Sequence, residues 1–149
     1  PDLPGANPEV RKVLFRAARA RARNPEEALE SGIAFSSIIA SDEGRARTEE
    51  RKELLQTAID RCFYPPGTRR QMAAIIQTGN LRPLTQTISV PTMVIHGADD
   101  PLIPHPCGAD IAANVNDASF QLVEGMGHDL PPSKLPHMVE LIAGHCRVA

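Results

Sequence analysis

The sequence has no tryptophan and few other aromatic residues, with one tyrosine and four phenylalanines. A folded core must therefore be built mainly from aliphatic side chains. No apolar run approaches the ~18–20 residues that a membrane-spanning helix needs. The chain also lacks a basic and apolar leader with a small-residue cleavage site. These absences predict a protein without a membrane span or a secretory signal.

Cysteine is scarce, and its odd number does not fit a disulfide framework. We therefore expect Cys62, Cys107 and Cys146 to be reduced thiols in a cytoplasmic protein. A metal site is a weaker alternative, because the spacing of the candidate ligands is not that of known zinc sites. Those candidates are His105, Cys107, His137, His145 and Cys146.

The chain has no large charge excess, since its net charge is −2 at pH 7. Residues 1–80 hold 13 Lys/Arg against 11 Asp/Glu, and residues 81–149 hold 3 against 7. Neither half is basic enough to indicate a nucleic-acid partner. A basic stripe near the start could attract anionic lipid or substrate, but it lacks the apolar aromatic face of a membrane-surface helix. We favour a solvated helix face, formed by Arg11, Lys12, Arg16, Arg19, Arg21 and Arg23.

The first half of the sequence has the pattern of helices separated by clear stops. Asn-Pro-Glu at 7–9 and at 24–26 predicts two helix starts. A third helix is expected after a polar break at 41–44, and 65–67 should end it. Thr68 is the expected cap of a fourth helix that stops at Gly79.

The second half changes to a pattern of alternating strands and helices. Residues 90–97 and 119–123 are predicted strands, the first of them buried, and 107–115 and 135–145 are predicted helices. This order indicates a parallel sheet with right-handed crossovers. Two strands alone make a poor sheet, and the first residue is Pro1 rather than methionine. We therefore expect further chain before it.

Titratable side chains follow both predicted strands. Asp99 and Asp100 come just after Gly97, and His128 follows the second strand in "EGMGHD" (124–129). Because the carboxyl ends of parallel strands share one edge of a sheet, an acid and an imidazole should meet there. A carboxylate that holds one ring nitrogen leaves the other free to act as a general base.

Two motifs in this region resemble the C-terminal part of an α/β-hydrolase. "GADDPLIP" (97–104) resembles the loop after strand seven of that family, with Asp100 at the acid position. "GMGH" (125–128) resembles the loop after strand eight, with His128 as the catalytic histidine. The resemblance implies an α/β fold, the C-terminal portion of an α/β-hydrolase sheet of parallel strands with crossover helices, preceded by an all-helical lid. It places the lid at 1–66 and the α/β core at 67–149.

The resemblance also implies a chemistry. Asp100 and His128 would be two members of a Ser-His-Asp triad that hydrolyses a small-molecule carboxylic ester, with no metal or organic cofactor. The segment "RCFYPPGTRRQMAAI" (61–75) is similar to bacterial esterases resembling aclacinomycin methylesterase.

The family's nucleophile is missing from these residues. Its serine lies in a Gly-x-Ser-x-Gly elbow, and no two glycines here are four apart. Ser36, Ser37 and Ser133 are not credible substitutes. We therefore expect the chain alone to be inactive and its partner to be a missing N-terminal hydrolase half. The alternative is a non-catalytic, hydrolase-derived module that binds a partner or self-associates through its exposed sheet edge.

Several simpler interpretations remain open for the individual residues. His128 could be a loop histidine bonded to backbone, and Asp100 could only cap the turn before Pro101. Asp99 competes for the acid role, although its spacing from Gly97 is less favourable. Asp129 is expected to be a loop carboxylate that could contact a partner domain. His96, at the end of the first strand, is expected to be structural.

Overall fold

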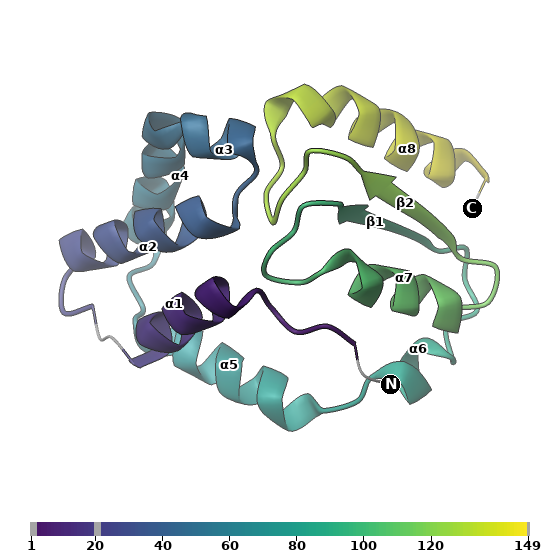
Figure 1. The fold of residues 1–149 in the computed structure, drawn as a ribbon, viewed down its shortest axis with the longest axis horizontal. Helices are drawn as coiled ribbons and strands as arrows, with labels where there is room; N and C mark the ends of the chain where they lie inside the picture. Colours follow the sequence, from purple (N-terminus) through teal and green to yellow (C-terminus); the bar gives the residue numbers. More distant parts are fainter. Residues whose placement is uncertain (1–2, 20–21, 149) are drawn as a thin grey trace.

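The computed structural model describes residues 3–19 and 22–148, with only the backbone at 17–19 and 148. Its helices and strands form two segments that lie side by side (Figure 1). The helical segment comprises α1 (Pro8–Arg19), α2 (Pro25–Ile39), α3 (Asp42–Ala46), α4 (Thr48–Arg61), α5 (Pro66–Thr78) and α6 (Arg82–Thr85). The α/β segment comprises β1 (Met93–Gly97), α7 (His105–Asn114), β2 (Ser119–Val123), the 3-10 helix η1 (Pro132–Lys134) and α8 (Leu135–Val148).

The two Asn-Pro-Glu helix starts are confirmed. The side-chain oxygen of Asn24 accepts a hydrogen bond from the Glu27 N–H at 2.8 Å, and that of Asn7 accepts one from the Glu9 N–H at 2.9 Å. These bonds satisfy N–H groups that the first turn of a helix leaves without a partner. Both helix starts therefore follow from local sequence.

Other helix boundaries differ from the prediction. The predicted break at 41–44 is shorter in the structure, because α2 ends at Ile39 and α3 already begins at Asp42. The Ser41 hydroxyl accepts a bond from the Gly44 N–H and caps α3. α5 begins at Pro66 rather than after Thr68, since proline suits the first helical turn. The short helix α6 was not predicted. The predicted boundary between 66 and 67 falls at the start of α5, and the helices continue to Thr85; that boundary stays a prediction.

The two predicted strands pair in parallel, as expected. Met93 is opposite Ser119, and the register continues to Gly97 opposite Val123. The prediction of a fully buried first strand was wrong, because only Gly97 in β1 is buried and the other residues are half-buried. A parallel strand is fully buried only where both faces and edges are covered, and the sheet within the described residues has two strands.

Few apolar side chains are buried, and all of them are aliphatic among the described residues. They are Val10, Ile39, Ala40, Ala112, Val115, Val123 and Met126. Val10, Ile39 and Ala40 belong to the helical segment, and the other four belong to the α/β segment. The absence of aromatic residues from this set agrees with the composition.

Backbone hydrogen bonds join the helical segment to both loops that follow the strands. The Asn7 N–H donates to the Pro101 carbonyl at 2.8 Å, and the His128 N–H donates to the Ile39 carbonyl at 2.8 Å. Farther from the strand ends, Arg82 of α6 pairs with Asp110 of α7, and this pairing holds the pKa of the Asp110 carboxyl below its usual value.

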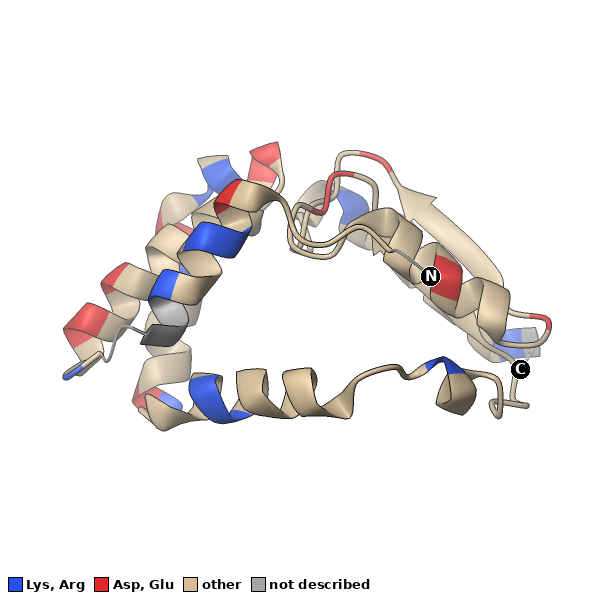
Figure 2. Ribbon diagram, turned by 60° about the horizontal axis from the view of Figure 1, so that its bottom comes forward, with Lys and Arg blue, Asp and Glu red and all other residues tan. Residues whose placement is uncertain are grey.

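Charges of both signs are spread over the helical segment (Figure 2). Lys12 pairs with Glu9 at 2.8 Å and Arg23 with Glu27 at 2.7 Å, so two cations of the basic stripe have acidic neighbours. The Arg19 side chain and Arg21 lie outside the described residues. In the part of the chain that the structure describes, no helix has the length and apolar character needed to cross a bilayer.

Candidate active site

Asp100 lies in the loop that follows β1 and is held there by local hydrogen bonds. Its Oδ1 accepts bonds from the N–H groups of Leu102 and Ile103, each at 2.9 Å. This is the turn geometry that an aspartate side chain commonly stabilises. The side chain is only 6% exposed. Because Oδ1 is occupied by the backbone, Oδ2 remains available for another partner.

His128 lies in the loop that follows β2. The chain turns there at Gly125, whose φ of 71° favours glycine. The backbone N–H of His128 donates to the Ile39 carbonyl at the end of α2. Its side chain is 39% exposed, in contrast to the buried carboxylate of Asp100.

The imidazole and the carboxylate meet at the carboxyl edge of the sheet. Nδ1 of His128 lies 2.8 Å from Oδ2 of Asp100, and the two loops follow neighbouring parallel strands. The pair lines an open depression of about 310 Å³. Thus the side chain of His128 binds a carboxylate rather than backbone, and Asp100 does more than cap its turn. The catalytic role of either residue stays a prediction.

This geometry defines which ring nitrogen is free. A carboxylate oxygen can only accept, so the short contact requires the hydrogen on Nδ1 of His128. Nε2 then has a lone pair and can take a proton from a neighbouring hydroxyl. The arrangement can therefore supply a general base whose tautomer and orientation are set by Asp100.

The two remaining candidates at this edge have other contacts. Asp99 is exposed, and its backbone N–H donates to the Met126 carbonyl at 3.0 Å. Nε2 of His96 lies 2.8 Å from the Ile103 carbonyl oxygen and 3.8 Å from Oδ2 of Asp100. Of the two aspartates, Asp100 is therefore the one that contacts His128, while His96 braces the Asp100 loop.

The residue that binds Asp129 is not one that the sequence predicted. Ser41, which is 4% exposed, donates from its N–H to Oδ1 of Asp129 at 3.0 Å and from its hydroxyl to Oδ2 at 2.8 Å. Asp129 is a loop carboxylate, as expected, but its contact is with the helical segment of this chain. A polar start signal before α3 was the only hint in the sequence.

The residues proposed as metal ligands do not form a cluster. Among the described residues, no three His, Cys, Asp or Glu side chains converge on a point that could hold a metal ion. The three cysteines are free, and burial raises the pKa of the Cys107 thiol.

A second cavity lies in the helical segment. Its volume is about 290 Å³, and its lining is mainly apolar, including Leu14, Phe35, Ile59, Phe63 and Tyr64. None of the residues that line it belongs to the Asp100 or His128 loops.

No protein-family model matches the sequence, but solved structures resemble the fold. An esterase from Exiguobacterium antarcticum superposes with a TM-score of 0.68 at 19% identity, over 93% of this chain and 47% of the esterase. A thermophilic esterase from Thermogutta terrifontis gives 0.64 at 22%, over 98% and 53%. MGS-M2, an α/β-hydrolase from a deep-sea metagenome library, gives 0.66 at 16%, over 97% and 53%.

These similarities show the fold of the chain. Helices followed by a small parallel sheet match the C-terminal portion of an α/β-hydrolase, and the chain spans about half the length of the structures that it matches. The fold class expected from the sequence is therefore confirmed.

Proposed function

We propose that the chain is part of a carboxylic ester hydrolase that uses a Ser-His-Asp triad, with His128 as general base and Asp100 as its acid. The observation that supports this best is the 2.8 Å contact between Nδ1 of His128 and Oδ2 of Asp100. The serine and the oxyanion hole belong, in this proposal, to a preceding hydrolase half outside these 149 residues. The substrate is a small-molecule ester, and no metal or organic cofactor takes part.

The proposed reaction proceeds through an acyl-enzyme. Nε2 of His128 takes the serine proton as the serine oxygen attacks the ester carbonyl carbon, and it then passes that proton to the departing alcohol. Water attacks the acyl group in the second half, and Nε2 carries its proton back to the serine oxygen. Asp100 stabilises the imidazolium in both steps and keeps its charge throughout.

We further propose that residues 1–66 form a lid over this site. Two backbone bonds support the proposal, because they join the start of α1 to the Asp100 loop and the end of α2 to the His128 loop. Such a cover excludes water and shapes the substrate site. The amino-acid sequence of residues 61–75 supports a closer relation to bacterial esterases resembling aclacinomycin methylesterase.

The test is serine-directed labelling of the longest naturally encoded protein that contains this chain. A fluorophosphonate should label one serine, and mass mapping should place it before residue 1 in a Gly-x-Ser-x-Gly sequence. Labelling should fall about 10³-fold or more in His128→Ala, because the serine then loses its base. The matched control is Asp99→Ala, which removes an exposed carboxylate from the same edge of the sheet and should label normally.

The opposite result favours a different class of function. If no serine is labelled and no Gly-x-Ser-x-Gly elbow is encoded, the triad proposal is wrong. The chain would then be a non-catalytic, hydrolase-derived module that binds a partner or self-associates through the edge of its two-stranded sheet.

A further inference from the structure

The carboxylate next to His128 has a set of partners that the proposed reaction does not use. Asp129 accepts three hydrogen bonds, two from Ser41 and one from the Gly127 N–H at 3.2 Å. Ser41 lies 88 positions away in the sequence. The carboxylate therefore joins the His128 loop to the corner between α2 and α3, and it reinforces the bond between His128 N–H and the Ile39 carbonyl.

The backbone of this loop also packs directly against the corner. A Cβ atom on Gly127 would lie 2.6 Å from the Ser41 nitrogen and 2.8 Å from the Ile39 oxygen. A side chain does not fit in that space. On its other side the loop touches the end of β1, where the Met126 carbonyl accepts the Asp99 N–H. Residues 126–129 are thus held between β1 and the helical segment.

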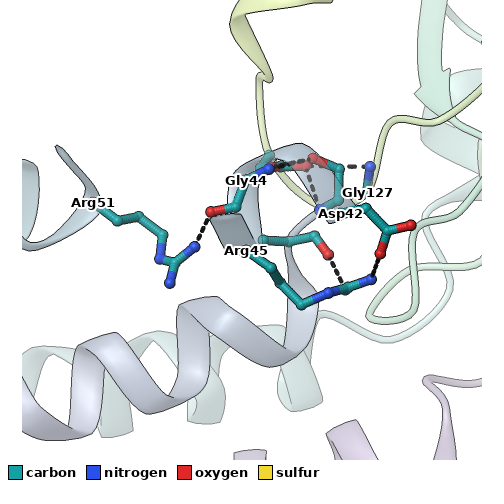
Figure 3. A network of polar contacts seen from close by, with 8 residues as sticks. Asp42, Gly44, Arg45, Arg51 and Gly127 are labelled. Carbon is teal, nitrogen blue, oxygen red and sulfur yellow. Dashed lines mark hydrogen bonds and ion pairs between the residues drawn. The ribbon is translucent and has the colours of Figure 1, made fainter. Parts of the chain in front are cut away.

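Two arginines bind this corner, Arg45 from within it and Arg51 from α4 (Figure 3). Arg45 binds the Ala40 carbonyl and the Asp42 carboxylate. Arg51 of α4 binds the Gly44 carbonyl, and its second terminal nitrogen donates to the Ser37 hydroxyl at 2.9 Å. Arg51 thus links α4 to both the end of α2 and the start of α3, on either side of Ser41.

A second serine–carboxylate contact flanks the first in the opposite sense. Ser133, which follows the His128 loop, donates its N–H and hydroxyl to the carboxylate of Glu43 in α3. Thus Ser41 of the helical segment binds Asp129 of the loop, and Ser133 beyond the loop binds Glu43 of the helical segment. Two such contacts on one short stretch fix its position more firmly than either alone.

We infer that Asp129 is a positioning residue. Its contact with Ser41 fixes the His128 loop against the helical segment, and this fixes the position of the His128 imidazole. This inference rests on the proposed function for its catalytic meaning. The hydrogen-bond partners of Asp129 are Ser41 and the Gly127 N–H rather than the imidazole, so it acts through the backbone on either side of His128. When the contact with Ser41 is lost, the loop loosens and the bond between Nδ1 and Asp100 is no longer held.

The experiment records the ring nitrogens of His128 by NMR in the 149-residue chain. The wild type should show one tautomer, with hydrogen on Nδ1. In Asp129→Ala and in Ser41→Ala the two nitrogen resonances should move toward each other as the tautomers mix. Hydrogen exchange at the His128 amide should become about fivefold faster, the effect of losing one typical hydrogen bond.

Asp129→Asn tests whether the hydrogen bonds of this side chain or its negative charge hold the His128 ring. Its oxygen can still accept from the two backbone N–H groups and its amide can donate to the Ser41 hydroxyl, so the wild-type tautomer should be retained without the negative charge. Asp99→Ala, which removes a nearby exposed carboxylate, should also keep the wild-type spectrum. Thermal unfolding verifies that each variant is folded, and Ser41→Ala decides the matter if Asp129→Ala does not fold.

Two outcomes would overturn the inference. One is a folded Ser41→Ala chain with wild-type ring resonances and amide exchange, and the other is an equal change in Asp99→Ala. The ring spectrum needs no nucleophile, so a tautomer change supports the inference even where no serine is labelled. An unchanged spectrum overturns it even where labelling succeeds.

In the longer natural protein that contains this chain, Asp129→Ala should lower kcat by about 10- to 100-fold with little change in KM. Asp129→Asn should restore kcat.

Discussion

At the scale of single residues, the candidate site divides its two groups by exposure. The Asp100 side chain is 6% exposed and is bonded through Oδ1 to backbone N–H groups. The His128 side chain is 39% exposed. A buried acceptor with a fixed orientation can hold a ring, while an accessible ring can exchange protons with a substrate or a nucleophile. The difference in burial therefore suits the different roles proposed for the two residues.

Asp100→Asn tests this division. The amide group of asparagine can donate to Nδ1, which would favour hydrogen on Nε2 and remove the free base. In the 149-residue chain, we therefore expect the chemical shifts of Nδ1 and Nε2 of His128 to swap, because the hydrogen moves from Nδ1 to Nε2. In the longer natural protein that contains this chain, kcat should fall by about 10⁴-fold, the loss that the same change causes in a serine protease triad. Asp99→Asn is the control, and an equal loss in it would show that charge rather than hydrogen-bond direction matters.

At the scale of elements, the site depends on how closely the end of β1 approaches the His128 loop. A Cβ atom on Gly97 would lie 2.3 Å from the Met126 carbonyl oxygen and 2.5 Å from that of Gly127. Both atoms belong to backbone, so neither can move aside at low cost. The glycine that ends β1 is therefore a packing requirement of the site as well as part of a recognisable motif.

Gly97→Ala should destabilise the chain by about 1–3 kcal/mol, the usual cost of overpacking a close contact. The matched control is Gly144→Ala in α8, where nothing lies within 4 Å of the added Cβ. Alanine is the better helix former, so the control should stabilise the chain by about 0.5–1 kcal/mol. Urea unfolding at neutral pH measures both changes. Equal effects of the two substitutions would contradict the close approach of β1 to the loop.

At the scale of the whole molecule, four serines of the chain have hydrogen-bond partners other than the proposed base His128. The hydroxyls of Ser36 and Ser37 donate to the Ile33 carbonyl inside α2. Those of Ser41 and Ser133 bind carboxylates. None of these four serines is bonded to the His128 ring, which binds Asp100 through Nδ1.

We therefore expect the 149-residue chain to show no turnover of p-nitrophenyl esters. The rate with the wild type and with His128→Ala should equal the rate without protein, measured by release of p-nitrophenol. Activity that His128→Ala abolishes would require a nucleophile within these residues. Addition of the preceding hydrolase half, expressed separately, should restore turnover if the two parts associate.

Part of this organisation was determined by the sequence alone. The Asn-Pro-Glu helix starts and the stop at Gly79 follow from interactions within a few residues, and the strand at 119–123 was predicted from its local pattern; the structure contains all of them. The parallel pairing, and with it the meeting of Asp100 and His128, followed from the order of strands and helices. These features are predictable because short-range hydrogen bonds and chain connectivity specify them.

Only the tertiary structure decided the rest. The half-buried state of β1 and the contact between Ser41 and Asp129 depend on where distant segments lie. At the expected break between two helices, Ser41 both caps α3 and binds the His128 loop through Asp129. Local propensity cannot predict such a contact, because its energy comes from a carboxylate 88 positions away that only the folded chain brings near.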